Sequence, residues 1–479
     1  MPPIFHNIIF FVAVLWCLAS CLPLAFPDRA LLRRLRLREK KRKRNQAKGP
    51  HSAEGSKVVS EADFSKNDRR KERLRGGVSL AVGVLVLVLL RPDAGFKAAG
   101  VTGASTNTEL ESLVIREAES FMDRQPILGM VAAVVHGDES FVLGFGRRDL
   151  STKESPDGDT VYELASLSKL FTGLLLAHEI EQGAVSLDDP VSQHLPKGVS
   201  LPDSTEELLI RHLATHTSGF PKNPENLKKM GSLAGYATGR SPYKGYTEQH
   251  FWEAVETLPL RSQPGEKVFY SNFGASLLAS LMANKRNTTF ESRTREVLCH
   301  PLGMKDTCVN PSEEQQTRRA RNYRSIIKLG GFHITLGADP WRVPDTMAGE
   351  GGLLSTGNDM LKFLQANIGQ PQSVLSKTIT AAQQELHPWT DNMSLGMLWF
   401  RTKREDHVLL QHEGRSTGQR SFIGVIEGQP TGIVLLSNGQ VEVDNLGKRL
   451  LRQMLRLDSA ATPSLRANNV NSPHTESSQ

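Results

Sequence analysis

The chain has 479 residues, of which 39% are hydrophobic and 23% are charged, so it is able to bury a sizeable core. Its net charge of +7 is unevenly distributed, because residues 1–76 contain 18 Lys and Arg against 7 Asp and Glu, which leaves 40 against 44 for residues 77–479. The body of the chain is therefore mildly acidic, and this argues against a nucleic-acid-binding protein.

Two apolar segments precede the body, and the first is residues 7–26. This run of 20 residues is nearly free of charge and is long enough to span a bilayer. Residues 29–48 follow it with eleven basic residues and one acidic residue, a charge run typical of a solvated or cytoplasmic flank. These features indicate that the N-terminal segment interacts with a membrane.

The second apolar segment has the parts of an export signal. A basic cluster at residues 69–75 precedes the apolar core 78–90, which is short for a spanning helix, and residues 94–105 are rich in small side chains. Either the true start lies downstream and this segment is cleaved, or the segment is an internal anchor. Both alternatives place the body outside the cytoplasm, in the periplasm. A cytoplasmic body would need a hairpin with its basic loop outside, against the positive-inside tendency.

The four cysteines are Cys17, Cys21, Cys299 and Cys308, and none forms a C-x-x-C pair or a zinc spacing. Cys299 and Cys308 are the only pair in the body. A disulfide between them requires an extracytoplasmic body, and two free buried thiols are the alternative.

The body begins with a helix and a hairpin. Residues 108–123 carry apolar side chains at helical spacing, and the β-rich runs Met130–His136 and Ser140–Arg147 flank a turn at Gly137. Helices and long loops are expected from about residue 197 to 364. The remaining elements are four β-type runs, residues 394–400, 408–411, 421–426 and 432–436, and a closing helix at about 444–455.

Strands at both ends of the body, with helices between them, predict an α/β fold of the α+β type. We expect one antiparallel sheet, completed from both ends and flanked by helices, beside an all-helical lobe. The chain then divides into an N-terminal membrane or export segment with a basic linker (1–99), one folded domain (100–457) and a disordered tail rich in Ser, Asn and Thr (458–479).

The stretch around Ser166 carries the first candidate chemistry. Ser166 and Lys169 lie three residues apart where a predicted apolar helix begins, so they share one helical face. A serine hydroxyl is a poor nucleophile unless a nearby base takes its proton, and a buried lysine amine one turn away can be that base. A chain of this length contains about one or two S-x-x-K matches by chance, so the motif needs partners.

Tyr270 and Asn272 form the second candidate. A turn signal leads to an aromatic run, then Tyr270-Ser-Asn272 and a helix. A tyrosine near a cationic amine can act as a phenolate or a proton shuttle, and Asn272 can bind an amide group of a substrate. A buried tyrosine with a hydrogen-bonded hydroxyl is the structural alternative.

The third candidate is His412-Glu-Gly414-Arg415, which ends a β-run. A glycine on an edge strand lets a substrate backbone approach closely, and the N–H of Arg415 would complete an oxyanion hole. A hairpin turn with a solvated histidine explains the same residues without chemistry.

The order of the three sites resembles the serine β-lactamase and penicillin-binding superfamily, specifically the class C β-lactamases and their esterase and D-amino-acid peptidase relatives. The resemblance covers roughly residues 108–456. Four intervening stretches agree with it: Ser186-Leu-Asp-Asp-Pro-Val191, Ile210-Arg-His-Leu-Ala-Thr-His-Thr-Ser-Gly219, Pro301-Leu-Gly-Met-Lys-Asp-Thr307 and Gly351-Gly-Leu-Leu-Ser-Thr356. It implies a β-lactamase/transpeptidase-like fold and a serine hydrolase without a cofactor.

The resemblance also implies a catalytic role for three residues. Ser166 is the nucleophile, Lys169 is its activating amine, and Tyr270 is the acid/base partner. The implied reaction passes through an acyl-enzyme, and the implied substrates are β-lactams, D-Ala peptides or esters.

Four further residues are implied to bind the substrate. Asn272 orients Lys169 and the substrate amide, His412 and Gly414 occupy the third motif, and the N–H of Arg415 forms the oxyanion hole with that of the nucleophile. Class C β-lactamases usually carry lysine where this chain has His412. An imidazolium binds a carboxylate only below its pKa, near 6.5 when unperturbed, so efficient β-lactam hydrolysis is less expected than ester or D-peptide hydrolysis.

Two other classes of function compete with this interpretation. A metal hydrolase would rest on His212 and His216 at i, i+4, but the glutamate of a His-Glu-x-x-His site is missing and no third ligand is apparent. We therefore predict no metal site. A non-catalytic cell-wall-binding homologue would keep the fold without the chemistry, although all the reacting side chains are present.

Overall fold

The computed structural model describes residues 98–102, 108–152, 154–229, 239–329, 332–370 and 372–468. They belong to one compact unit, Phe96–Gln479. The apolar segments 7–26 and 78–90, on which the membrane and export predictions rest, lie outside the described residues. In the part of the chain that is described, no helix combines the length and the apolar character needed to cross a membrane.

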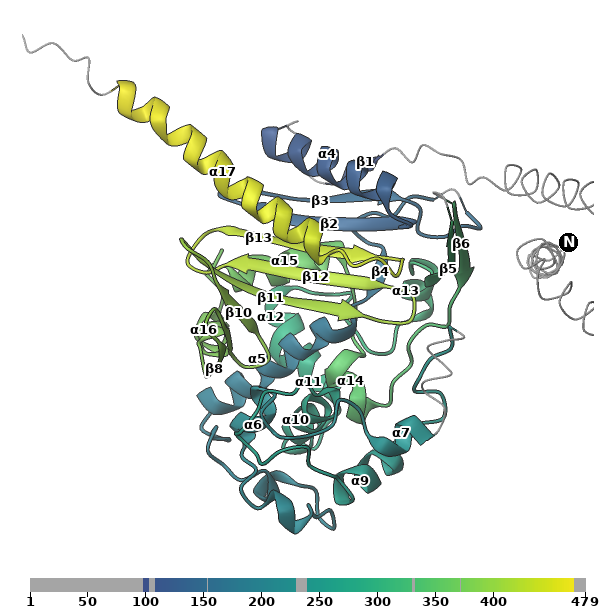
Figure 1. The fold of residues 1–479 in the computed structure, drawn as a ribbon, viewed down its shortest axis with the longest axis vertical. Coiled ribbons are helices and arrows are strands. Elements are labelled where there is room, and N and C mark those ends of the chain that lie inside the picture. The colour runs from purple at the N-terminus through teal and green to yellow at the C-terminus, as the bar shows by residue number, and fades with distance from the viewer. Residues whose placement is uncertain are drawn as a thin grey trace, which may run out of the picture. The chain divides into compact units, whose positions relative to one another are not determined.

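A nine-stranded antiparallel sheet forms the centre of the described fold (Figure 1). The strand order is β1-β3-β2-β13-β12-β11-β10-β9-β8, so strands from the two ends of the unit meet where β2 pairs with β13. The predicted sheet, completed from both ends of the body, is confirmed. Its strands are β1 (Ala98–Thr102), β2 (Gly129–His136), β3 (Glu139–Gly146), β8 (His387–Thr390), β9 (Met393–Leu395), β10 (Phe400–Lys403), β11 (Val408–Arg415), β12 (Arg420–Ile426) and β13 (Thr431–Ser437).

The central strands are apolar on both faces because each face packs against a separate core. In β2, Met130 and Ala132 join one apolar cluster, whereas the alternating residues Val131 and Ala133 join the other. Successive side chains of a strand point to opposite faces, so a continuous apolar run is the expected sequence for a strand covered on both sides.

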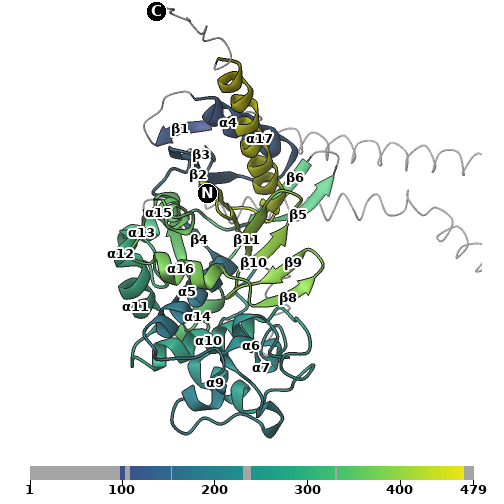
Figure 2. The same cartoon turned by 90° about the vertical axis from the view of Figure 1, so that its left-hand side faces the viewer.

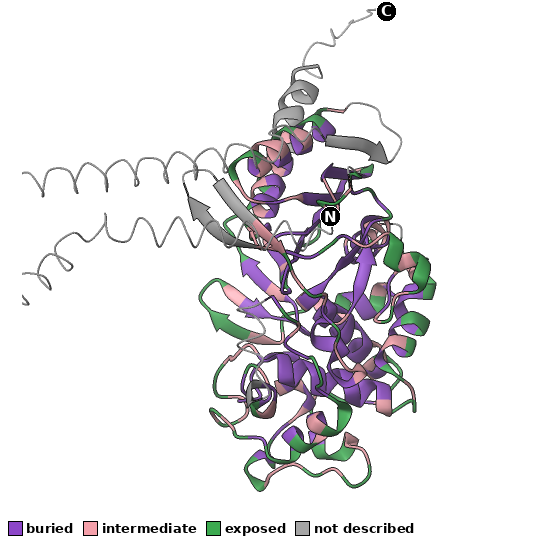
Figure 3. Cartoon of the chain, turned by 90° about the vertical axis from the view of Figure 1, so that its right-hand side faces the viewer, coloured by how far each residue is buried: buried purple, intermediate pink, exposed green. Residues whose placement is uncertain are grey.

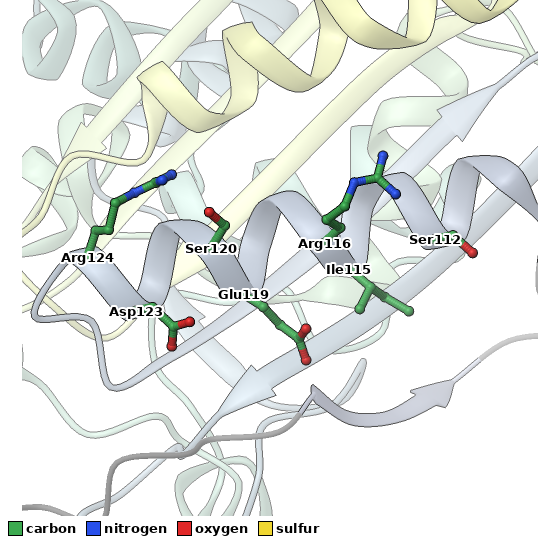
Figure 4. A pocket seen from close by; sticks show the side chains of 7 residues that line it. All are labelled: Ser112, Ile115, Arg116, Glu119, Ser120, Asp123 and Arg124. Atoms are coloured by element: carbon green, nitrogen blue, oxygen red, sulfur yellow. The ribbon is translucent and has the colours of Figure 1, made fainter.

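Helices α4 (Glu109–Arg124) and α17 (Asp444–Asn468) cover one face of the sheet (Figure 1). The side chain of Thr108 caps α4 by accepting a hydrogen bond from the N–H of Glu111. The outward face of α4 borders a hollow of about 590 Å³ and carries one apolar side chain, Ile115, among polar and charged side chains of both signs. The others are Ser112, Arg116, Glu119, Ser120, Asp123 and Arg124 (Figure 4).

The helical lobe lies on the other side of the sheet (Figure 2). Figure 3 shows that its central helices are buried on nearly all sides, and these include α5 and α10. The helices of this part are α5 (Ser168–Glu181), α6 (Ile210–Ala214), α7 (Glu225–Lys229), α9 (Glu248–Glu256), α10 (Asn272–Asn284), α11 (Phe290–Thr294), α12 (His300–Leu302), α13 (Glu313–Thr317), α14 (Asp345–Gly351), α15 (Gly357–Asn367) and α16 (Ser376–Gln383). Short helical turns join them: η1 (Ala165–Leu167), η2 (Val191–His194), η3 (Asp203–Thr205) and η4 (Arg295–Cys299).

Several elements differ from the sequence prediction. The run expected at residues 394–400 is two strands, β9 and β10, because residues 396–399 leave the sheet between them. Two small antiparallel pairs were not expected, and three of their four strands lie in the region expected to hold helices and long loops. These are β4 (Val161–Glu163) with β7 (Leu354–Thr356), and β5 (Tyr323–Leu329) with β6 (Phe332–Gly337).

The ends of the domain also differ from the expected boundaries. Strand β1 pairs with β3 and begins before residue 100, inside the stretch interpreted as part of an export signal. Helix α17 is described as far as Asn468, beyond the expected domain end at residue 457, so the disordered tail from residue 458 stays a prediction.

Cys299 and Cys308 are both buried and free. The structure therefore has the two buried thiols that were the alternative to a disulfide. Burial raises the pKa of each thiol to about 12. Both thiols are therefore protonated and unreactive at neutral pH.

Candidate active site

Ser166 lies in a tight turn between strand β4 and helix α5. The turn is the 3₁₀ segment η1, and α5 begins two residues after Ser166. Ala165 has φ 47°, a left-handed conformation that costs a non-glycine residue roughly 1–2 kcal/mol. The predicted helix start is correct to within two residues, and a strained backbone holds the serine at the helix entrance.

Lys169 faces Ser166 from the first turn of α5. Its Nζ lies 3.2 Å from Ser166 Oγ and 2.6 Å from the carbonyl oxygen of Glu350. The Glu350 carboxylate forms an ion pair with the same nitrogen, at 3.4 Å, and both side chains are fully buried. The structure therefore brings together the predicted Ser-x-x-Lys pair, since three residues make nearly one helical turn.

Tyr270 lies beside the lysine, just before helix α10. The Lys169 Nζ is 4.9 Å from the centroid of the Tyr270 ring, and the Nζ of the exposed Lys222 is 5.9 Å from it. Within the described residues the Tyr270 hydroxyl has no hydrogen-bond partner. The hydrogen-bonded alternative considered from the sequence is therefore not observed, and two cations lie within reach of the ring.

Asn272 is the first residue of α10, and its side chain is almost completely buried. Its Nδ2 donates to the Asn223 side-chain oxygen at 2.9 Å, whereas its Oδ1 is buried without a partner among the described residues. No described hydrogen bond joins Asn272 to Lys169, so the expected orientation of the lysine by Asn272 is not seen here. The unpartnered Oδ1 is suited to accept a hydrogen bond from a substrate N–H.

Strand β11 packs directly on the turn that carries Ser166. A Cβ atom on Gly414 would clash with the carbonyl oxygen of Leu164 and would lie 3.2 Å from the backbone nitrogen of Ser166. The Oγ of Ser421, which pairs with Gly414 across the sheet, donates to the same carbonyl at 2.7 Å. Glycine is required here because the strand and the turn approach too closely for any side chain.

His412 is buried within β11, because the strand continues to Arg415 and does not stop at Gln411, where the predicted β-run ends. Its Nδ1 lies 2.9 Å from the carbonyl oxygen of Glu413, so Nδ1 carries the proton and Nε2 holds the free lone pair. Burial, assisted by the charge of Lys169, lowers the pKa of His412 to about 3. The Nε2 atom has no partner among the described residues. His412 is therefore neutral at pH 6 and offers an acceptor, not a cation.

The side chains of Arg415 and Arg420, near the third motif, both interact with other groups of the protein. Arg415 forms an ion pair with Glu442, and Arg420 donates to the carbonyl oxygens of Ser416 and Gln419. The Arg415 side chain is therefore directed to the adjacent helix-entry segment, and its expected contribution is limited to its backbone N–H.

The sequence did not reveal a wall of aromatic rings that includes Tyr270. The ring of His216 lies 4.7 Å from the Tyr270 ring, and Phe400 lies 6.2 Å from each of them. Trp389, which is 43% exposed, continues this wall at 6.0 Å from Phe400. Trp389 belongs to β8, which was overlooked because Pro388 argues against a strand and is tolerated only at the sheet edge, where β8 lies.

The metal alternative receives no support from His212 and His216. The Nδ1 of His212 accepts from the N–H of Leu209, and that of His216 accepts from the N–H of Ser271. Among the described residues, three carboxyl groups do lie within 4.8 Å of one another: the exposed Glu413 and Glu442 and the buried Asp444. The last two pair with Arg415 and Lys448, so the cluster is part of an ion-pair network.

A cavity of about 770 Å³ joins the predicted groups. Six of the seven predicted residues line it, and Lys169 lies buried behind Ser166. The six are Ser166, Tyr270, Asn272, His412, Gly414 and Arg415. Segments far apart in the sequence thus place a paired serine and lysine, a tyrosine and an amide around one space large enough for a small substrate.

The family model described as Beta-lactamase matches residues 114–455, which is most of the described unit. The chain belongs to the β-lactamase family. The family model spans the Ser166 turn, the Tyr270 segment and strand β11, so all three predicted motifs fall inside it.

Relatives of this β-lactamase-family chain include a D-alanyl-D-alanine-carboxypeptidase/endopeptidase and several β-lactamases. It is 30% identical over 254 residues to the D-alanyl-D-alanine-carboxypeptidase/endopeptidase AmpH of Escherichia coli K12, with 53% of this chain and 60% of AmpH aligned. It is 26% identical over 304 residues to a β-lactamase of Yersinia enterocolitica, covering 61% of this chain and 70% of that protein. The chain thus spans less than two thirds of the AmpH length.

The fold is similar to that of a solved structure of the family. A β-lactamase/D-alanine carboxypeptidase from Pseudomonas syringae superposes with a TM-score of 0.60 at 22% identity, covering 73% of this chain and 99% of the other. The expected fold, an antiparallel sheet flanked by helices with a helical lobe, is confirmed by this similarity and by the strand order.

Proposed function

We propose that this chain is a serine hydrolase that forms an acyl-enzyme at Ser166. The observation that carries the proposal is the distance of 3.2 Å between Lys169 Nζ and Ser166 Oγ, at the edge of a cavity that Tyr270 and Asn272 also line. A serine paired with a buried amine is the arrangement needed to make the hydroxyl nucleophilic. The proposed substrates are β-lactams, D-alanyl peptides or esters.

In the proposed acylation, Ser166 Oγ attacks the carbonyl carbon of the substrate and its proton passes to the Lys169–Tyr270 pair. The same pair protonates the leaving group when the acyl bond breaks, and a water molecule then hydrolyses the acyl-enzyme. The backbone N–H groups of Ser166 and Arg415 are the proposed oxyanion hole. The close packing of Gly414 on the Ser166 backbone supports this role, because it brings the two segments together.

The substrate class is supported by the relatives and by His412. AmpH is named for D-alanyl-D-alanine carboxypeptidase and endopeptidase activity, and other relatives are named β-lactamases. Because His412 is neutral, the third motif attracts a substrate carboxylate less than a lysine would. This favours the second candidate function, a carboxylesterase without β-lactamase activity, over efficient β-lactam turnover.

The location of the enzyme is part of the proposal. The apolar and basic segments before residue 98 support a membrane-anchored or exported chain with its hydrolase domain outside the cytoplasm, in the periplasm. Fusing alkaline phosphatase to the C-terminus tests this, since that reporter is active only after export. An inactive fusion at normal protein level would place the domain in the cytoplasm.

The decisive experiment is labelling with a fluorescent penicillin and with an activated ester. Mass spectrometry of the trapped adduct should locate the added mass on the peptide that contains Ser166, and Ser166→Ala should lose both labelling and turnover. A chromogenic cephalosporin and a panel of short-chain esters then rank the substrates. Labelling at another residue would exclude the mechanism, and binding without acylation would indicate a non-catalytic wall-binding homologue.

A further inference from the structure

Glu350 is a buried carboxylate that the acyl-transfer scheme above does not use. It lies near the end of α14, a helix that packs between α5 and α10, and its side chain has no exposed surface. One carboxylate oxygen, Oε2, lies 3.4 Å from Lys169 Nζ, and the other, Oε1, accepts a hydrogen bond from the hydroxyl of Tyr243. Both oxygens therefore have donors.

Three oxygen atoms surround the Nζ of Lys169. They are Ser166 Oγ, the Glu350 carbonyl oxygen and Glu350 Oε2, and each lies within hydrogen-bond reach. Two of the three belong to one residue. The direction in which Lys169 presents its nitrogen to the serine therefore depends on where Glu350 is held.

The Glu350 carboxylate is itself held in place by Tyr243, which packs on Trp341. The ring of Tyr243, which holds Oε1, packs edge-on against the Trp341 ring at 5.2 Å. Trp341 is in turn fixed because its backbone N–H donates to Glu163 at 2.9 Å and its indole N–H to Thr417 at 2.6 Å. The orientation of the Glu350 carboxylate is thus determined by well-packed neighbours.

We propose that Glu350 is a positioning residue, whose carboxylate holds the Nζ of Lys169 against Ser166 Oγ, with Tyr243 holding the carboxylate. The inference rests on the proposed function of Ser166 and Lys169. Glu350 does not line the cavity, so it reaches the substrate only through Lys169. Stabilisation of the fold does not by itself explain the Lys169–Glu350 ion pair, because a buried ion pair gives little net stabilisation over apolar packing.

The backbone of α14 is attached to α5 independently of this carboxylate. The Thr172 hydroxyl donates to the carbonyl oxygen of Gly349 at 2.9 Å, and the Ser168 hydroxyl accepts from the N–H of Leu353 at 3.0 Å. In Glu350→Gln the backbone carbonyl acceptor should therefore stay in place. An amide offers one oxygen where the carboxylate offers two, so either Lys169 or Tyr243 loses its acceptor.

The test compares Glu350→Gln with the wild type in single-turnover acylation and in steady state, per folded molecule by circular dichroism. We expect kcat and the acylation rate to fall about tenfold to hundredfold, as for a reacting group displaced by a fraction of an ångström, with KM within twofold. Tyr243→Phe should show a smaller fall of the same kind. The matched control is Glu179→Gln. Glu179 lies in α5 and, like Glu350 in α14, is a fully buried glutamate that forms an ion pair.

The outcomes separate this inference from the proposed function. If Glu350→Gln and Tyr243→Phe acylate Ser166 at the wild-type rate, Glu350 has no positioning role, while the serine mechanism stands. If Glu350→Gln and Glu179→Gln lose activity only in proportion to their folded fraction, the role of Glu350 is structural. If Glu350→Gln does not fold, the acylation rate of Tyr243→Phe tests the positioning role, because this variant leaves the Lys169–Glu350 ion pair in place. Absence of Ser166 labelling in the wild type would instead contradict the proposed function.

Discussion

The backbones of Gly414 and Ser166 are in such close contact that a Cβ atom on the glycine would lie 3.2 Å from the serine nitrogen and would clash with the carbonyl oxygen of Leu164. Gly414→Ala should push strand β11 away from the nucleophile turn. A displacement near 1 Å costs roughly a hundredfold in rate, and we expect a loss of that size in the acylation of Ser166. The matched control is Gly337→Ala, whose added Cβ would meet ordinary contacts of 3.6 Å or longer. Equal acylation rates in the two variants would show that β11 does not shape the site.

The sequence predicted this site well where the chemistry is local in the chain. Ser166 and Lys169 are nearly one helical turn apart. The continuous apolar sequences of β2 and β13 indicate directly that these two strands are buried. It missed Glu350 because a single glutamate in a glycine-rich stretch has no periodicity and gains its meaning only from a contact with Lys169. It considered His216 only as a metal ligand and missed the contact of its ring with Tyr270, which the left-handed backbone of His216 at φ 56° accompanies. Such long-range contacts leave no pattern within a sequence window.

Lys169→Ala and Tyr270→Phe should each lower kcat more than they raise KM, because both groups are proposed to move protons in the transition state. The expected loss is roughly a hundredfold to ten-thousandfold for each. Steady-state kinetics with an activated ester gives both constants. A Tyr270→Phe enzyme at the wild-type rate would remove the tyrosine from the proton path.

The two buried histidines should make folding stability depend on pH. Burial lowers the pKa of His412 to about 3 and holds that of His216 well below 6.5. The unfolded chain binds protons at these groups near pH 6.5 and the folded chain does not, so their contribution is complete above that pH and is lost as the pH falls. Between pH 6 and 5 His412 alone should cost about 1 kcal/mol of unfolding free energy, and His216 should add a loss of the same sign.

Urea unfolding at a series of pH values measures this effect. His216→Phe removes one of the two titrating groups, so the loss of unfolding free energy between pH 6 and 5 should be smaller than in the wild type. An unchanged pH dependence in the variant would mean that His216 is protonated in the folded protein.

A chain that begins at Phe96 should fold as a soluble domain, because this residue opens the compact unit and keeps strand β1. A chain that begins at Thr108 loses β1 and exposes the edge of β3, a template for pairing with another molecule. We expect the shorter chain to aggregate more on size-exclusion chromatography. Aggregation of both, with a monodisperse full chain in detergent, would show that residues 1–95 belong to the fold.

The state of His412 predicts how substrate choice depends on pH. An imidazolium that held a carboxylate would lose it between pH 6 and 8, and KM for an anionic β-lactam would rise, as the sequence alone predicts. With the pKa lowered to about 3 and Nδ1 bound to the Glu413 carbonyl, His412 is neutral over this whole range. The ratio of kcat/KM for an anionic cephalosporin to that for a neutral ester should therefore stay constant from pH 6 to 8.

His412→Lys supplies the contrast. An ammonium at this position should favour the anionic substrate by at most one charge-assisted hydrogen bond, about 1.5–3 kcal/mol, and leave the neutral ester unchanged. We would measure kcat/KM for both substrates at pH 6, 7 and 8 in the two proteins. A cephalosporin-to-ester ratio that falls with pH in the wild type and is flat in the variant would show that His412 is charged and binds the carboxylate. A ratio that is flat in both, and higher only in the lysine variant, is the result that the buried neutral histidine requires.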